Sequence, residues 1–359
     1  MVSSIHVLGS HELGGADRFF ARLVEALHHA GHPSLAVIRP DSPLRQVLAA
    51  EIEQVHLPMA SKWDLLSRWR LTRLIGQRQP DVVQSYMGRA TRLTRLPAGS
   101  HALHVARLGG YYKIDGYYRH AHAWVGNTQD ICDYMVREGL PPERVFYIGN
   151  FVPQPRPVNA DEVRSLRAHL GLDHDAFVIF ALGRMVAKKG FRDLLEAFAR
   201  LEPTVGGRPL VLLIAGDGVQ REPLANIARQ LGVASRVRWA GWQNDPTPYF
   251  ALGDVFVCPS RHEPLGNVIL EAWQHRLPVL STRNEGARSL LRDGENGLLA
   301  PLADPAGLAE AMQRMLALSA AERGRLAEAG HATVQREHRE DAVVAAYLAL
   351  YEKKLRAGR

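Results

Sequence analysis

Two glutamates lie eight positions apart in the stretch SRHEPLGNVILEAW, residues 260–273. The Pro-Leu-Gly turn breaks the chain and Asn267 is a good N-cap, so we expect a helix to begin there with Glu271 one turn inside. Glu263 then lies in the loop before the helix, where the helix dipole alone would stabilise a carboxylate. Glu271 has apolar neighbours, and a partly buried carboxylate needs hydrogen-bond donors. The hydroxyl groups of a ribose would supply them.

Two cations occur in the stretch ALGRMVAKKGF, which follows another apolar run. Arg184 comes directly after the predicted strand 177–182, and Lys189 stands before Gly190 and the helix that we expect next. Fixed cations at a helix start stabilise a diphosphate leaving group, because its charge grows as the bond to it breaks. Cations in a loop are usually just solvated, but the position at the end of a strand favours a functional role.

Glycines and a tryptophan follow three other predicted strands. Gly14 and Gly15 precede a helix and would let the backbone approach a ligand closely, although a plain tight turn explains them equally well. The motif is not Gly-x-Gly-x-x-Gly, so the fingerprint of a dinucleotide-binding site is missing there. Only Asp41, near the end of the second predicted strand, still favours a dinucleotide ligand. The IAGDGVQ turn at 214–220 is more readily structural. Trp242 could form a flat wall against a nucleobase or belong to the core.

Short apolar runs alternate with helical patterns along the whole chain, such as the helical stretch 16–30. The predicted strands of the first series are 5–8, 34–38, 82–83, 103–108 and 124–126; those of the second are 177–182, 211–215, 237–240, 255–258, 279–281 and 297–299. Strands that alternate with helices imply two parallel, doubly wound α/β sheets. In such sheets ligands bind beyond the carboxyl ends of the strands.

The two series define the expected domains. We predict a first domain at 1–150, a linker at 151–162 that overlaps the proline-rich stretch NFVPQPRPVN, and a second domain at 163–338. A last helix at 339–359 has no strand after it. It could cross back to the first domain or cap the second sheet.

Composition narrows the class of protein. The chain has 359 residues, 46% hydrophobic and 23% charged, which is enough for two full cores. We expect no signal peptide and no transmembrane helix, because no apolar run approaches the roughly 18 residues that a span requires. The two cysteines, Cys132 and Cys258, are too few for a disulfide framework, so we expect a cytoplasmic protein.

The formal charge of +7 is concentrated in residues 62–119, which hold eleven Lys and Arg but only three Asp. Such a segment attracts phosphate-rich partners: a phosphorylated acceptor, an anionic membrane surface or nucleic acid. No zinc knuckle, helix-turn-helix or RNP motif accompanies the charge, so we expect no nucleic acid partner. Arginines on solvated helix faces explain the charge equally well.

Six motifs occur in a fixed order: GGADR, GRMVAKKG, LLIAGDG, EPLGNVILEAW, LPVLST and DGENGLLAPLADPAGLAEAM. In this order they resemble the retaining nucleotide-sugar glycosyltransferases of family four, which have the GT-B fold. The resemblance covers nearly the whole chain and is strongest over 177–312. The stretch RLGGYYK is similar to the subset that builds lipopolysaccharide core and related surface glycans. That subset would act at the inner face of the cytoplasmic membrane, as peripheral proteins.

The resemblance implies a sugar donor in a cleft between two Rossmann-like domains. Glu271 would hold the ribose hydroxyls, Glu263 the donor-sugar hydroxyls, and Arg184 with Lys189 the diphosphate. The remaining donor-binding candidates are Gly14, Gly15, Gly183, Leu265, Gly266, Asn267, Val268 and Trp242. By analogy the reaction retains the anomeric configuration through front-face attack, in which the leaving phosphate helps to deprotonate the acceptor.

The resemblance implies neither a metal nor another cofactor. The Asp-His-Asp at 173–175 matches the pattern of metal-dependent transferases, but it precedes a predicted strand, so we take the match as chance. Nucleotide-sugar is then a substrate whose base, UDP, GDP or ADP, is left open.

The first domain departs from the family pattern. Many members have histidine where this chain has Gly109-Gly110, and a second frequent histidine corresponds to Gln84. Candidates for acceptor or phosphate contacts are therefore Arg89, Arg107, Gly109, Gly110, Tyr111 and Lys113. The departure also keeps two alternatives open: a non-catalytic nucleotide-sugar-binding protein, and a sugar-nucleotide epimerase or phosphorylase on the same fold.

Overall fold

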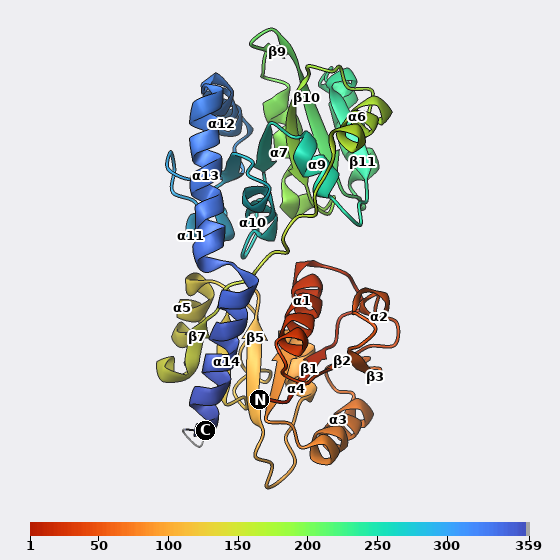
Figure 1. Cartoon of the computed structure of the whole chain (residues 1–359), viewed down its shortest axis with the longest axis vertical. Coiled ribbons are helices and arrows are strands. Elements are labelled where there is room, and N and C mark those ends of the chain that lie inside the picture. Colours follow the sequence, from red (N-terminus) through yellow and green to blue (C-terminus); the bar gives the residue numbers. More distant parts are fainter. Residues whose placement is uncertain (357–359) are drawn as a thin grey trace. The chain divides into compact units, whose positions relative to one another are not determined.

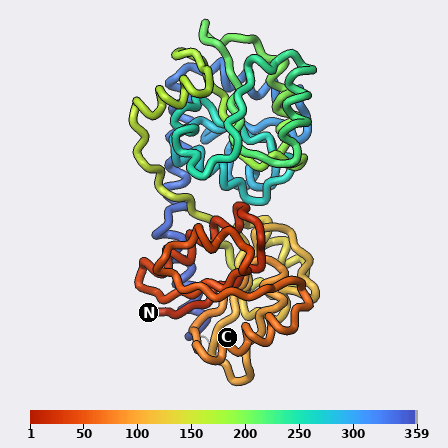
Figure 2. Tube along the Cα trace, turned by 90° about the vertical axis from the view of Figure 1, so that its right-hand side faces the viewer, coloured from red at the N-terminus to blue at the C-terminus, as the bar shows by residue number. Residues whose placement is uncertain are grey.

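The computed structural model describes residues 1–356 and divides into two compact units. The first contains Met1–Phe151 together with the C-terminal segment from His338, and the second contains Val152–Glu337. Figure 2 shows the blue C-terminal end of the trace within the unit that begins with the red N-terminus. No helix among residues 1–356 combines the length and the apolar character needed to cross a membrane.

The first unit contains a seven-stranded sheet with the order β3-β2-β1-β4-β5-β6-β7, in which all neighbours are parallel. The strands are β1 Ser4–Leu8, β2 Ser34–Ile38, β3 Glu53–His56, β4 Val82–Tyr86, β5 Leu103–Leu108, β6 Ala123–Gly126 and β7 Val145–Tyr147. Strands β1, β2, β4, β5 and β6 are buried on both faces, which is why they appear as continuous apolar runs.

Helices cover both faces of this sheet (Figure 1). They are α1 Gly15–His29, α2 Leu44–Val47, α3 Leu65–Arg78, α4 Met87–Leu93, α5 Gln129–Arg137 and α14 Glu340–Arg356, with a 3₁₀ turn η1 at Pro142–Arg144. Helices α1, α2 and α14 share one hydrophobic cluster with the sheet, while α3, α4 and α5 pack in clusters on its other face. The C-terminal helix α14 is thus part of the first unit's core.

The second unit repeats this architecture. Its sheet has the order β11-β10-β8-β12-β13-β14, all parallel, and β9 pairs antiparallel with β10. The strands are β8 Phe177–Leu182, β9 Thr204–Val205, β10 Arg208–Ala215, β11 Val237–Gly241, β12 Val255–Cys258, β13 Val279–Thr282 and β14 Leu298–Ala300.

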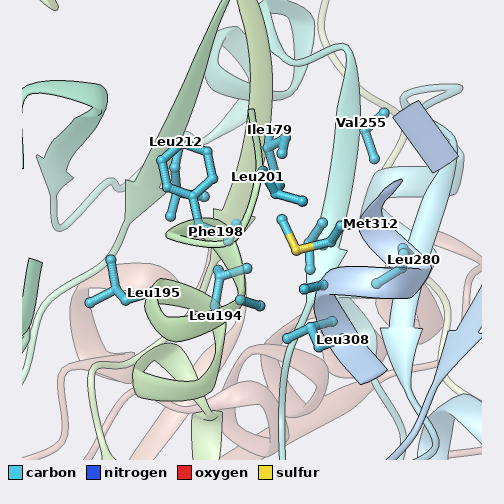
Figure 3. Packing of buried hydrophobic residues seen from close by; sticks show 14 of the residues in the cluster. Ile179, Leu194, Leu195, Phe198, Leu201, Leu212, Val255, Leu280, Leu308 and Met312 are labelled. Carbon is cyan, nitrogen blue, oxygen red and sulfur yellow. The ribbon is translucent and has the colours of Figure 1, made fainter. Parts of the chain in front are cut away.

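Two layers of helices enclose the second sheet. They are α6 Ala160–His169, α7 Phe191–Phe198, α8 Arg221–Gln230, α9 Thr247–Leu252, α10 Asn267–Gln274, α11 Glu285–Leu290, α12 Pro305–Ala317 and α13 Ala320–Glu337; the 3₁₀ turns are η2 Ala187–Lys189 and η3 Ala234–Arg236. Figure 3 shows α7 and α12 meeting on one face, where Leu194 and Phe198 pack near Leu308 and Met312. Helices α9, α10 and α11 pack on the other face.

Each sheet has one point where the strand order reverses, between β1 and β4 in the first unit and between β8 and β12 in the second. Loops at the carboxyl ends of such strand pairs diverge to opposite faces and leave a crevice between them, where open α/β sheets bind ligands. The fold class predicted from the sequence, two Rossmann-like doubly wound parallel sheets, is confirmed.

Element boundaries differ from the sequence-based expectations in a few places. The strand expected at 82–83 continues to Tyr86, and β3, β7 and β9 were not predicted. The segment expected as a linker at 151–162 includes the start of α6, and the second unit begins at Val152. The predicted last helix begins at Glu340, and its final residues, 357–359, lie outside the described residues.

Candidate functional site

The loops after β8 and β12 meet at the strand-order reversal of the second sheet. The Lys189 ammonium group, at the end of η2, forms an ion pair with Glu263, 74 positions later in the chain. Both side chains are largely buried, at 17% and 15% exposure. Burial lowers the pKa of Lys189, but the Glu263 carboxylate outweighs this effect and the pKa lies above its ordinary value. The ammonium group therefore stays charged.

Several contacts fix the loop that carries Glu263. The Arg261 guanidinium binds both carboxylate oxygens of Asp193 on α7, at 2.7 and 2.6 Å. The backbone N–H groups of Arg261 and His262 donate to the carbonyl oxygen of Lys188. The Glu263 N–H donates to the Glu285 carboxylate at 3.2 Å. The two loops are thus joined by backbone and side-chain bonds, and the ion pair has little freedom.

Helix α10 begins directly after this loop. Gly266 is its N-cap and has a φ of +83°, a conformation that favours glycine, so Asn267 is the first helical residue instead of the predicted cap. Leu265 is buried at 5% exposure, whereas Asn267 and Val268 are partly exposed. The N–H groups of a first helical turn have no partner within the helix and attract anions.

Glu271 lies one turn after Asn267 on α10, and both side chains are partly exposed on the same side of the helix. The opposite side is fixed in the core by Ile269, Leu270 and Trp273, all at 0% exposure. The buried positions hold the helix, and the side that remains open carries the carboxylate that the sequence singled out.

Gly183 and Arg184 follow β8 directly. A side chain at Gly183 would lie within 3.8 Å of the Lys189 aliphatic chain, so the lysine passes closely over this glycine. The Arg184 charge acts to lower the pKa of Lys189, which indicates that the two cations are near each other. The neighbouring IAGDG turn supports this loop: Gly216 has a φ of +126°, and a Cβ there would lie 2.0 Å from the Gly183 carbonyl oxygen.

Trp242 lies beyond β11, at the edge of the sheet and two strands away from β8. Its side chain is 44% exposed and its indole N–H donates to the Asn244 side chain at 3.1 Å. The sequence left two roles open for Trp242, a flat wall against a nucleobase or a place in the core. Its exposure excludes the core.

In the first unit, Gly14 is the N-cap of α1 and Gly15 its first residue. The Gly14 N–H donates to the Asp17 carboxylate at 2.9 Å, and burial raises the pKa of Asp17 above its ordinary value. The other oxygen of Asp17 is buried and has no hydrogen-bond partner among residues 1–356. Sequence analysis missed Asp17, although an acidic residue three positions after a helix cap was a usable signal.

Arg89 lies at the strand-order reversal of the first sheet. Its guanidinium donates to the carbonyl oxygens of Gly9, at 3.2 Å, and Met59, at 3.1 Å, and so joins the ends of β1 and β4 to the segment before α3. Met87, between β4 and Arg89, has a φ of +64°, a strained conformation for a residue with a side chain. The position is compatible with the predicted contact to an acceptor or phosphate.

Arg107 is 2% exposed, within β5. Its Nε donates to the Tyr347 hydroxyl of α14 at 3.1 Å, another nitrogen donates to Asn150, and its guanidinium lies 4.2 Å from the centre of the Phe19 ring. These contacts give Arg107 a structural task, joining α14 to the sheet, that the sequence did not indicate.

Gly109 and Gly110 follow β5 as expected. A side chain at Gly109 would lie 3.5 Å from an Arg107 nitrogen and 3.6 Å from the Asn127 amide nitrogen. The Asn127 amide oxygen is buried and has no hydrogen-bond partner in the described part of the chain. Tyr111 is 37% exposed and Lys113 is exposed. A Cβ at Gly109 or at Gly110 would meet its neighbours at ordinary van der Waals distances. Asn127 was not predicted.

Gln84 does not lie beyond a strand end, as the sequence suggested, because β4 continues to Tyr86. Its side chain is fully buried and donates to the Tyr86 hydroxyl at 2.6 Å, while its oxygen accepts from Tyr351 of α14 at 2.6 Å. Gln84 therefore belongs to the interface between the sheet and α14. Among residues 1–356, no three His, Cys, Asp or Glu side chains cluster in a way that could hold a metal ion.

The second unit thus presents two cations, two carboxylates and a helix N-terminus at one strand-order reversal. Cations and helix N–H groups bind phosphate, and carboxylates accept hydrogen bonds from hydroxyl groups. A polyhydroxylated phosphate ester matches both kinds of group.

Comparisons with known proteins agree with this fold. The family model described as Glycosyltransferase Family 4 matches residues 13–154, and the model described as Glycosyl transferases group 1 matches residues 176–318. The lipopolysaccharide core biosynthesis glycosyltransferase LpsE of Rhizobium meliloti is 40% identical over 343 residues, 95% of this chain and 96% of the relative. LpsD of the same organism is 36% identical and covers 95% of each chain.

A solved structure shares the fold of the whole chain. The structure of Anabaena Alr3699/HepE, in complex with UDP and glucose, superposes with a TM-score of 0.85 at 18% identity, over 98% of this chain and all of the other. The fold is that of an α/β glycosyltransferase with two Rossmann-like units, the GT-B fold. This chain belongs to glycosyltransferase family four, as the ordered motifs predicted.

Proposed function

We propose that this chain transfers a sugar from a nucleotide-sugar donor to a lipid-linked or phosphorylated glycan, in the synthesis of lipopolysaccharide or a related surface polysaccharide. Two relatives that match 95% of the chain are glycosyltransferases of lipopolysaccharide core biosynthesis. The HepE structure with UDP and glucose supports a nucleotide-sugar donor. The observation that carries the donor site is the buried Lys189–Glu263 pair beside the N-terminus of α10.

The proposed roles follow from the charge of each group. Lys189 and Arg184 stabilise the diphosphate as it departs, together with the backbone N–H groups of residues 265–268. Glu271 accepts hydrogen bonds from the ribose hydroxyls, and Glu263 from the donor sugar. Gly14, Gly15, Gly183 and Trp242 complete the donor contacts, and Arg89, Gly109, Gly110, Tyr111 and Lys113 those to the acceptor.

The proposed reaction retains the anomeric configuration and needs no metal. The bond between the anomeric carbon and the phosphate oxygen breaks, the acceptor oxygen forms its bond on the same face, and the acceptor proton moves to the leaving phosphate. The charge that develops on the phosphate is met by Lys189 and Arg184, a role that a divalent cation has in other phosphate chemistry. The protein acts at the inner face of the cytoplasmic membrane, where a lipid-linked acceptor is presented.

Donor binding is tested first. Thermal-shift measurements with UDP-, GDP- and ADP-sugars should show stabilisation by at least one of them, because a ligand that binds only the folded state raises its stability. Lys189→Ala and Glu271→Ala should lose that stabilisation. Lys188→Ala, an exposed lysine of the same loop, and Glu310→Ala, an exposed glutamate on α12, are the controls and should keep it. Wild-type stabilisation in both site variants would contradict the proposed donor site.

The reaction is tested next with purified acceptor. The product linkage, assigned by NMR, should have the same anomeric configuration as the donor sugar, and a chelator should leave the rate unchanged. An inverted linkage would overturn the retaining mechanism, and activity lost to a chelator but restored by a divalent cation would overturn metal independence.

A further inference from the structure

The first unit exposes an unusual run of large apolar side chains around the start of α3. Trp63, Leu65, Leu66 and Trp69 are 64, 71, 53 and 56% exposed. Thirteen large apolar side chains are exposed among residues 1–356, and four of them fall within these seven positions. Single exposed apolar residues are common, but a contiguous group marks a surface that binds something.

The geometry of α3 explains why these side chains cannot be part of its own core. The helix packs on the sheet through Leu71 and Ile75, which are 0 and 1% exposed. Leu65, Trp69 and Arg73 follow one another at intervals of one turn, on the opposite side. Figure 1 shows α3 at the periphery of the first unit. A helix that faces water is polar on its outer side, whereas this one carries leucine and tryptophan there.

Cations lie over the two exposed tryptophans. The Arg92 guanidinium is 3.8 Å from the centre of the Trp63 ring and the Lys62 ammonium group is 5.8 Å from it, while Arg73 lies 5.6 Å from the Trp69 ring. Arg92 is itself fixed, since its Nε donates to the Lys62 carbonyl oxygen. The Trp63 ring is therefore held in its exposed position by the cations beside it.

The same surface carries uncompensated positive charge. Lys62, Arg68, Arg70 and Arg73 are exposed, and none forms an ion pair with a carboxylate in the part of the chain that is described. The nearest acidic residue in sequence, Asp64, caps α3 by accepting from the Ser67 N–H at 2.9 Å. We call these eight residues the α3 patch: Lys62, Trp63, Leu65, Leu66, Arg68, Trp69, Arg70 and Arg73.

We propose that the α3 patch docks this chain onto an anionic phospholipid surface. Tryptophan and leucine enter the boundary between headgroups and acyl chains, and the surrounding cations bind lipid phosphates. Apolar and basic residues are interleaved on this side of the helix. Such a surface fits a bilayer, because the apolar side chains reach the acyl chains while the basic side chains reach the lipid phosphates. The inference rests on the proposed function in one respect, a lipid-linked acceptor, since docking brings the enzyme to it.

Vesicle binding tests the proposal with the full chain. Wild-type protein should co-sediment with vesicles of phosphatidylglycerol and phosphatidylcholine, bind vesicles of phosphatidylcholine alone far less, and lose binding as salt rises. The double variant Trp63→Ala/Trp69→Ala should bind at least roughly tenfold more weakly, because it lacks the two aromatic side chains that enter the lipid. The matched pair Val47→Ala/Leu302→Ala, exposed apolar residues elsewhere, should bind as wild type does.

A second matched pair separates this surface from the chain's general positive charge. Arg70→Glu/Arg73→Glu should abolish binding to the anionic vesicles. Arg164→Glu/Arg325→Glu changes the net charge equally at two arginines of the second unit that are 72 and 79% exposed, and should retain binding. Equal loss in both pairs, or no binding by the wild type, overturns the proposal. So does light scattering that finds a wild-type dimer and a monomeric Trp63→Ala/Trp69→Ala variant, since the patch would then join two copies of the chain.

The closing measurement separates this inference from the proposed function. Each variant is also tested for stabilisation by nucleotide-sugar and for transfer to acceptor in detergent, which the α3 patch variants should keep while transfer to acceptor in vesicles falls. Nucleotide-sugar binding without vesicle binding would overturn only the docking surface. Vesicle binding without any nucleotide-sugar binding would overturn only the proposed donor.

Discussion

At the scale of single residues, the Lys189–Glu263 pair explains how a buried lysine stays charged before any phosphate is present. Burial alone favours the neutral amine, and the adjacent carboxylate reverses that preference. In the proposed donor site, an entering diphosphate would bring its own negative charge, so Lys189 would exchange one anionic partner for another without losing its proton. Glu263 would then be released to accept hydrogen bonds from the donor sugar, the role proposed for it.

We predict that the pair is energetically coupled. Glu263→Gln leaves the ammonium group without a counter-charge and should destabilise the protein by a few kcal/mol, at the lower end of the roughly 3–5 kcal/mol known for buried pairs, since both side chains keep some exposure. Lys189→Met/Glu263→Gln should cost less than the sum of the two single changes. Urea unfolding of the four proteins measures the coupling. Additive effects would contradict it.

The pH dependence of the same pair has a definite sign. The folded-state pKa of Lys189 lies above its unfolded value of about 10.4, so the stabilisation is fully present below that pH and is lost as pH rises through the folded pKa. The stability difference between wild type and Lys189→Met should therefore be constant from about pH 7 to pH 9 and shrink only in stronger alkali. A difference that disappears between those two values would mean that Lys189 is not held charged by Glu263.

At the scale of elements, the position of α10 depends on close contact with α13. A Cβ at Gly330 of α13 would lie 2.2 Å from Trp273 of α10, so only glycine allows the two helices to approach this closely. The Trp273 indole N–H also donates to the Asn296 carbonyl oxygen at 3.1 Å. Glu271 and Asn267 project from the other side of the same helix, so a displacement of Trp273 would move both.

We predict that Gly330→Ala destabilises the protein by about 1–3 kcal/mol and weakens donor binding, because the added methyl group forces α10 to shift. Gly324→Ala is the control: it lies on the same helix, is exposed, and meets nothing within 4 Å. That change should stabilise by up to about 1 kcal/mol through helix propensity. Thermal unfolding with and without nucleotide-sugar measures both effects. Equal responses of the two variants would refute the packing argument.

The sequence predicted elements well where burial is complete and poorly elsewhere. Five strands of the first sheet and six of the second were expected from apolar runs, because a parallel strand covered on both faces is apolar throughout. Strands β3 and β7 escaped notice since they form the two edges of the first sheet, and β3, with the sequence EQVH, is partly exposed along its length. The polar end of β4 was missed because Gln84 is satisfied by Tyr351, 267 positions away.

In the candidate site, only the features that depend on local sequence could be predicted. The residue types and strand-end positions of Arg184, Lys189, Glu263 and Glu271 were visible locally. The ion pair across 74 positions was not, nor was the burial of Arg107 against a helix from the other end of the chain. Such contacts depend on how distant segments pack, which no local pattern contains.

At the scale of the whole molecule, the first unit is assembled from both ends of the chain. The chain leaves it after Phe151 and returns at His338, and α14 then supplies Val343, Tyr347 and Tyr351 to its core. The hydroxyl groups of the two tyrosines bind Arg107 and Gln84 inside the sheet. The first unit therefore has a complete core only when the last helix has been added, whereas the second unit is continuous in sequence.

This arrangement predicts two separable unfolding transitions, since each unit has its own core. Tyr347→Phe removes only the hydroxyl that accepts from the buried Arg107, and should destabilise the first unit by about 1.5–3 kcal/mol, a drop of several degrees in its Tm. The proposed contacts to the nucleotide, Arg184, Lys189 and Glu271, all lie in the second unit. In calorimetry, bound nucleotide should therefore raise the transition of the second unit, and that transition should not move in this variant. Glu352→Ala, an exposed position on the same helix, is the control and should leave both transitions in place. A nucleotide-sensitive transition that falls together with the other would show that the two units unfold as one, and that the effect of α14 extends beyond the sheet on which it packs.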